Sequence, residues 1–120
     1  MKVLLFQPRF ADLVRSGAKT QTIRRDRKHP IKVGDQLSLR RWTGKPYRSK
    51  QEVLGAAQCV AEIPCLIYEY GAMVGTNLAV NAEGFALKDG FASFEEMREW
   101  FDSTHGLPFS GTLIRWRLTA

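Results

Sequence analysis

A lysine, two threonines and an arginine follow directly after a glycine in residues 17–24, which read Gly-Ala-Lys-Thr-Gln-Thr-Ile-Arg. Because side chains alternate along a strand, Thr20, Thr22 and Arg24 are expected on one face. Two hydroxyls and a guanidinium suit a phosphate, a carbonyl or the edge of a nucleobase. If the chain still turns after the glycine, Lys19 converges with Thr22, and a lysine of lowered pKa can take the hydroxyl proton and make the threonine nucleophilic. An ordinary strand beside a solvated lysine shows the same pattern, because threonine favours strands.

Three segments, taken in order, resemble the signature of the ASCH domain family. The first is residues 17–24, preceded by an expected helix that carries Phe10 and Leu13. The second is residues 33–37, Val-Gly-Asp-Gln-Leu, a turn into a strand. The third is residues 89–97, Asp-Gly-Phe-Ala-Ser-Phe-Glu-Glu-Met, which enters an expected helix. The resemblance implies a PUA-like β-barrel whose cleft binds RNA or a modified nucleoside.

The resemblance also implies a possible reaction. Some small bacterial members of the family are amidohydrolases that remove acyl groups from N4-acylated cytidines, and their pattern is a lysine, a threonine three positions later and a distant glutamate. Lys19 and Thr22 match this pattern in type and spacing. The carboxylate departs from it. Asp89 or Glu83 would orient the lysine; Asp89 is favoured because it stands before the expected helix, and Glu83 lies six residues earlier. Other members have been linked to RNA cleavage.

Three interpretations follow. The leading hypothesis is an RNA- or nucleoside-binding domain whose basic cleft is lined by Lys19, Thr20, Thr22 and Arg24. The alternative is a hydrolase, either an N4-acylcytidine amidohydrolase or a ribonuclease, that uses Lys19, Thr22 and a carboxylate in the same cleft. The third is a basic interaction module whose cleft is occluded.

Charge is distributed unevenly along the chain. The formal net charge is +6, but residues 24–50 hold ten Lys and Arg against two Asp, whereas residues 62–102 hold eight acidic residues against two basic ones. A field polarised in this way steers anionic partners to one side of the molecule. Aromatic residues interleaved with arginines can stack exposed bases, although Trp42 can equally cap the core. The residues predicted to contact a ligand or nucleic acid are Thr20, Arg24, Arg25, Arg40, Arg41, Trp42 and Tyr47.

The elements that position these residues follow from hydrophobic periodicity. Helices are expected over residues 8–16 and 93–103, and strands over 1–6, 20–24, 36–43, 53–70 with a bend near Pro64, 76–82 and 111–119. Strands and helices do not alternate regularly, so the sequence predicts an α+β fold: a mixed, mainly antiparallel β-barrel with two short helices packed on it. The predicted core includes Leu37, Leu39, Leu66, Phe101, Ile114 and Trp116.

The 120 residues are expected to form a single domain, residues 1–120, and a cytoplasmic monomer. No apolar run approaches the roughly 20 residues that span a membrane. Cys59 and Cys65 are separated by about 20 Å in an extended strand, too far for a disulfide unless Pro64 folds the strand back. His29 and His105 are remote in sequence, and no metal or other cofactor is expected.

Overall fold

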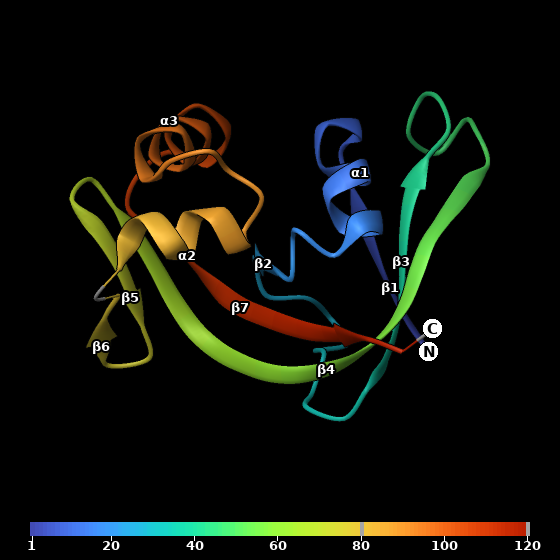
Figure 1. The fold of residues 1–120 in the computed structure, drawn as a ribbon, viewed down its shortest axis with the longest axis horizontal. Coiled ribbons are helices and arrows are strands. Elements are labelled where there is room, and N and C mark those ends of the chain that lie inside the picture. The colour runs from blue at the N-terminus through green and yellow to red at the C-terminus, as the bar shows by residue number, and fades with distance from the viewer. Residues whose placement is uncertain (80, 120) are drawn as a thin grey trace.

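Seven strands and three helices occupy the part of the chain that the computed structural model describes, residues 1–79 and 81–119 (Figure 1). In chain order they are β1 (Lys2–Phe6), α1 (Pro8–Ser16), β2 (Gln21–Arg24), β3 (Gln36–Trp42), β4 (Gln51–Tyr68), β5 (Gly71–Val74), β6 (Asn77–Leu78), α2 (Ala82–Lys88), α3 (Phe94–His105) and β7 (Phe109–Leu118). The predicted α+β class is confirmed.

The strands join in one mostly antiparallel sheet. Its order is β1-β3-β4-β5-β6, and β7 pairs with both β4 and β2. The long strand β4 runs beside β7 from Ala57 opposite Leu118 to Ile67 opposite Phe109. In Figure 1 these two strands form a curved floor, and all three helices lie over its concave side. The site is therefore expected between the helices and this floor.

The sheet is open between β1 and β2. In the described residues β1 pairs only with β3, in parallel, and β2 pairs only with β7, so the closed barrel expected from the sequence is not seen. Side chains span the gap instead. Arg24 Nη2 donates a hydrogen bond to the carbonyl oxygen of Leu5 at 2.7 Å, and Arg27 Nη1 donates to that of Val3 at 3.4 Å. Hydrogen bonds from two arginine side chains therefore link the edges that backbone hydrogen bonds would join in a closed barrel.

The ends of α1 and α3 follow the predicted signals. Helix α1 starts at Pro8, which suits a first helical position, and ends at Gly17, whose φ of 85° is left-handed. Helix α3 starts after Ser93, whose side chain accepts a hydrogen bond from the backbone N–H of Glu96 at 3.1 Å. This is the cap predicted from the serine and the glutamate three residues later.

The core forms where the alternation predicts it, with one exception. Leu37, Leu39, Phe101, Ile114 and Trp116 are buried, which confirms their prediction. Leu66 is only half-buried, because its neighbours Cys65 and Ile67 take the core face of β4. Both cysteine thiols, those of Cys59 and Cys65, are buried and free.

Two other local predictions need correction. Strand β4 continues through Pro64, and its pairing shifts register between Val53 and Gly55 against β3 and between Cys59 and Ala61 against β7. Pro64 is tolerated because β4 has only β7 as its ladder partner there. Of the strand expected over residues 76–82, only β6 is present in the described residues. Residue 80 lies outside the described residues, and residue 82 belongs to helix α2, which was not predicted. No helix in the described ranges is long and apolar enough to cross a membrane.

Candidate functional site

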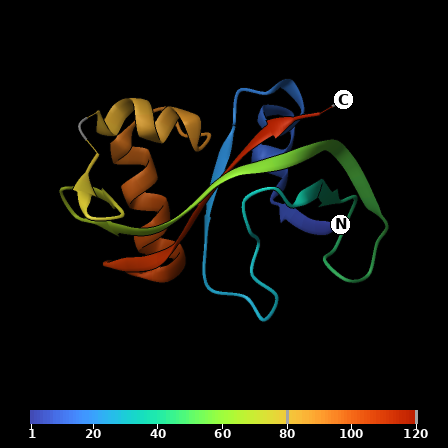
Figure 2. The same ribbon diagram turned by 90° about the horizontal axis from the view of Figure 1, so that it is seen from below.

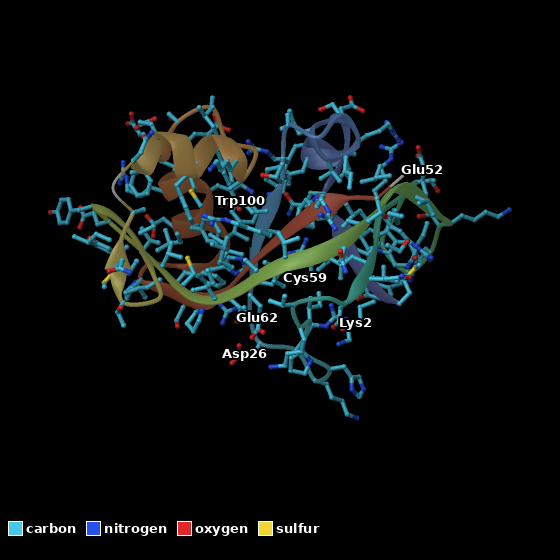
Figure 3. The ribbon with its side chains drawn as sticks, turned by 60° about the horizontal axis from the view of Figure 1, so that its bottom comes forward. Lys2, Asp26, Glu52, Cys59, Glu62 and Trp100 are labelled. Carbon is cyan, nitrogen blue, oxygen red and sulfur yellow. The ribbon has the colours of Figure 1, made fainter. Side chains whose placement is uncertain are left out.

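A cavity of about 310 Å³ lies between the ends of β1 and β2 and the helices α1 and α3. Its charged and hydroxyl-bearing walls include Lys19, Thr22, Arg24, Arg25, Asp89 and Thr104. Its aromatic walls are Phe6, Phe10, Phe91, Trp100, Phe101, His105 and Phe109. Figure 3 shows Trp100 beside β2, under the helices. Polar groups that converge in an aromatic cavity of this size are typical of a small-molecule site.

At the inner wall, Lys19 and Asp89 form a buried pair. The two residues are 2% and 3% exposed, and Lys19 Nζ donates a hydrogen bond to the backbone oxygen of Asp89 and lies 3.7 Å from Asp89 Oδ2. Gln21 Nε2 donates to Asp89 Oδ1 at 3.4 Å, and Arg115 Nε donates to Gln21 Oε1 at 3.2 Å. The carboxylate is therefore held by a cation and by an amide whose orientation an arginine fixes.

The backbone explains why this pair forms. After Gly17 the chain turns, and the N–H of Lys19 donates to the carbonyl oxygen of Leu13 at 2.9 Å. The next N–H, that of Thr20, donates to the carbonyl oxygen of Lys88 at 3.0 Å, which ties the start of β2 to the end of α2. Asp89 follows at once, so two segments that are distant in sequence meet where the lysine and the carboxylate face each other.

Gly90 makes room for the lysine stem. Its φ is +94°, and a Cβ there would lie 3.1 Å from both Lys19 Cδ and Phe10 Cδ1. We expect Gly90→Ala to lower the free energy of unfolding by about 1–3 kcal/mol, because it adds left-handed strain to a steric overlap. Urea denaturation measures the loss.

Gly55→Ala is the matched control for this substitution. Gly55 has no positive φ, and its Cβ would make an ordinary contact of 3.5 Å with Leu118. We expect this variant to change the stability by less than about 0.5 kcal/mol. Equal losses in the two variants would contradict the role given to Gly90.

Burial moves the pKa values of the pair toward each other. Loss of solvation lowers the pKa of Lys19 to about 8, although the Asp89 charge opposes this and the Arg24 charge adds to it. Loss of solvation raises the pKa of Asp89 to about 6, against the opposing charge of Lys19. Both groups are charged at pH 7, but a proton leaves the lysine more readily than it leaves a solvated one. Such shifts accompany proton transfer in many active sites.

Thr22 is held by Arg24 on the same wall. Arg24 Nε donates to Thr22 Oγ1 at 2.9 Å, and its guanidinium lies 4.9 Å from the centroid of the Phe6 ring. Burial lowers the pKa of Arg24 to about 10, so the group stays charged at neutral pH. A charged donor on the hydroxyl oxygen leaves the hydroxyl proton free to be donated and stabilises negative charge on the oxygen.

The structure brings five of the predicted site residues to this cavity: Lys19, Thr22, Arg24, Arg25 and Asp89. Between the two predicted carboxylates it places Asp89 at the lysine. Glu83 is exposed on α2, and its Oε2 accepts the backbone N–H of Phe94 at 3.1 Å. Glu83 therefore supports the start of α3.

Five predicted contact residues lie outside the walls of this cavity: Thr20, Arg40, Arg41, Trp42 and Tyr47. Arg40 donates to Gln51 Oε1 at 3.1 Å, and Arg41 donates to Glu52 Oε2 at 3.0 Å, so both engage partners across the β3–β4 hairpin. Trp42 packs on Tyr47, with ring centroids 5.2 Å apart. The basic cluster of β3 is thus separate from the cavity.

Sequence reasoning missed Gln21 and the aromatic walls. Gln21 is fully buried, and a lone glutamine in a strand carries no motif. The only available signal was its position two residues after Lys19. Trp100, on α3, is half-buried and lines the cavity. Core and aromatic ligand walls use the same residue types, so periodicity does not separate them.

Comparison of the chain with models of known families, with curated proteins and with solved structures found no match. Within residues 1–79 and 81–119, no group of three His, Cys, Asp or Glu side chains is placed to hold a metal ion. The side chains of the cavity themselves provide a lysine–aspartate pair, threonine hydroxyls, two arginines and aromatic rings.

Proposed function

We propose that this protein is an ASCH-like domain that binds a modified nucleoside, free or within RNA, in the aromatic cavity. The observation that carries the proposal is the buried Lys19–Asp89 pair beside Thr22 and Arg24, enclosed by aromatic rings. Aromatic walls stack on the face of a planar base. Buried polar groups then select the pattern of donors and acceptors on the edge of that base.

The polar wall fits the edge of a cytosine. Cytosine presents a donor at its exocyclic N4 amine, and its ring nitrogen and carbonyl oxygen are acceptors. Asp89 supplies acceptor atoms, Lys19 and Arg24 supply donors, and the Thr22 hydroxyl can do either. The resemblance to the ASCH family favours the same class of ligand. It also favours a PUA-like fold, in which the gap between β1 and β2 would be the open side of the barrel.

The test is nucleoside binding measured by calorimetry, with cytidine and N4-acetylcytidine as probes. We expect Thr22→Val to weaken binding about three- to tenfold, because it removes one hydrogen-bonding group and keeps the side-chain shape. Thr20→Val is the matched control, since Thr20 is half-buried two residues before Thr22 but lines neither this cavity nor the adjoining one. If the parent protein binds neither these nucleosides nor short RNA that contains them, the proposal fails.

One pair of observations favours hydrolysis as a second candidate function. The Arg24–Thr22 hydrogen bond stabilises a developing alkoxide, and the lowered pKa of Lys19 makes its neutral amine available near pH 8. In this mechanism Lys19 takes the hydroxyl proton while Thr22 Oγ1 attacks the acyl carbon of an N4-acylcytidine. The C–N4 bond breaks, and the lysine returns the proton to N4. Water then hydrolyses the acyl-threonine ester and releases the carboxylate.

A further inference from the structure

A second cavity, of about 440 Å³, opens on the gap between β1 and β2. It shares Leu5, Arg24 and Arg25 with the first cavity. Its other walls are Val3, Leu4, Asp26, Arg27, Pro30, Ile31, Tyr47, Glu62, Thr112 and Ile114. Arg24 crosses the gap to reach Leu5, so the two cavities meet at the guanidinium groups of Arg24 and Arg25.

Two loops frame the second cavity. One follows β2 and carries Arg25, Asp26 and Arg27, and the other joins β3 to β4 and carries Tyr47. In Figure 2 the two loops are seen to either side of β1, and both contribute side chains to the cavity wall. The cavity therefore combines an apolar floor from the sheet with charged and aromatic groups from the loops.

Tyr47 is the unusual residue of this cavity. It is 88% exposed, yet its φ of 63° is left-handed, a conformation that bulky residues rarely adopt. Its ring packs against Trp42, with centroids 5.2 Å apart. The protein thus holds an aromatic side chain outward at the cavity mouth with a second ring behind it. Backbone strain that persists at a cavity points to a functional contact.

The charges of the cavity match a ribonucleotide. The three arginines, Arg24, Arg25 and Arg27, outnumber the two carboxylates of the cavity. A guanidinium group suits a phosphate because it can donate two parallel hydrogen bonds to the phosphate oxygens. Asp26 and Glu62 lie close together beneath the sheet in Figure 3. Carboxylates repel phosphate but accept hydrogen bonds from ribose hydroxyls, which provide both donors and acceptors. The negative charge of Glu62 is also compensated by Lys32, whose Nζ lies 3.7 Å from Glu62 Oε1.

We propose that the second cavity binds the ribonucleotide that adjoins the nucleoside in the first cavity. The shared arginines Arg24 and Arg25 hold the connecting phosphodiester, the carboxylates face its ribose, and Tyr47 stacks on its base. The natural ligand is then an RNA strand of at least two nucleotides. This inference rests on the proposed function, because it assumes a nucleoside in the aromatic cavity.

The experiment compares the affinities of nucleosides and dinucleotides for the purified protein. The probes are N4-acetylcytidine and the two dinucleoside monophosphates that join it to uridine, one on its 3′ side and one on its 5′ side; the same three with unmodified cytidine are run in parallel. We expect one dinucleotide of a set to bind about tenfold more tightly than its nucleoside, through one stacked base and one phosphate. This gain is expected to decrease as salt increases, because the phosphate contact is electrostatic.

Variants of Tyr47 identify the source of the gain. Asparagine tolerates a left-handed backbone, so Tyr47→Asn removes the ring without new strain, and we expect it to abolish most of the gain while nucleoside affinity stays constant. Tyr47→Phe is expected to retain the gain. Tyr70→Asn is the matched control, because Tyr70 is 84% exposed but does not line either cavity.

The outcomes separate this inference from the proposed function. If nucleosides bind and dinucleotides bind no more tightly, the second cavity is not a nucleotide subsite and the proposed function stands. If the dinucleotide gain survives Tyr47→Asn, the assignment of Tyr47 as the stacking residue is overturned. If neither nucleosides nor dinucleotides bind, both proposals fail together. Tight dinucleotide binding that depends on Tyr47 supports the inference even where the nucleoside alone binds too weakly to measure.

Discussion

Replacing Asp89 with alanine is expected to lower the free energy of unfolding by about 3–5 kcal/mol. The substitution leaves the Lys19 ammonium in a site where only 2% of the residue is exposed, with no carboxylate beside it. Gln21 also loses the acceptor of its 3.4 Å hydrogen bond. Urea denaturation at pH 7 measures the loss.

A double variant distinguishes the loss of a counter-ion from a simple packing defect. Lys19→Met combined with Asp89→Leu removes both charges and approximately conserves volume, and we expect it to recover most of the stability that Asp89→Ala loses. Asp12→Ala is the surface control. Asp12 accepts a hydrogen bond from Arg15 at 3.1 Å but is exposed, so its loss is expected to cost less than about 1 kcal/mol. A double variant as unstable as Asp89→Ala would contradict the ion-pair explanation.

The second large effect concerns turnover. The Lys19–Thr22 mechanism predicts that the purified protein releases cytidine and acetate from N4-acetylcytidine, and that Thr22→Ala reduces the rate by about 10³-fold or more, as expected when a nucleophile is removed. Lys19→Ala is expected to have the same effect, with circular dichroism as the check that the variant remains folded. The assay is chromatographic measurement of cytidine over time.

The pH dependence of this reaction has a defined sign. Lys19 acts as a base only when neutral, and burial lowers its pKa to about 8. The value of kcat/KM is therefore expected to rise with pH and to level off above about 8. Turnover that survives Thr22→Ala would show that another group is the nucleophile. A parent protein that binds the nucleoside without releasing acetate would be a binding domain.

Local signals predicted much of this fold. Alternating leucines located β3, Pro8 and Gly17 marked the ends of α1, and Ser93 marked the start of α3. Helix α2 was missed because it has only seven residues, Ala82–Lys88, with a glycine inside. Local sequence patterns could not predict whether the sheet closes into a barrel. Closure depends on whether β1 and β2 pair with each other, and the sequence of neither strand specifies its partner.

The candidate site divides in the same way. Lys19, Thr22 and Arg24 are neighbours in the chain, so their spacing alone placed them together. Asp89 was favoured over Glu83 by its place before the helix, but its contact with Lys19 depends on the turn between α2 and α3, a long-range feature. Arg40 and Arg41 were predicted as ligand contacts because a run of basic residues does not reveal partners such as Gln51 and Glu52, which come from the facing strand.

The two arginines shared by the cavities, Arg24 and Arg25, have a thermodynamic consequence. Arg24 is already held by its hydrogen bonds to Thr22 and Leu5, whereas Arg25 is exposed. A ligand in either cavity that fixes Arg25 removes part of its conformational freedom, and a second ligand then binds without that entropic cost. Two unlinked molecules, one in each cavity, are therefore expected to bind cooperatively. By thermodynamic reciprocity each raises the affinity of the other by the same factor. Because β1 and β2 share no backbone ladder in the described residues, the side chains shared by the two cavities are the structural elements through which the coupling passes.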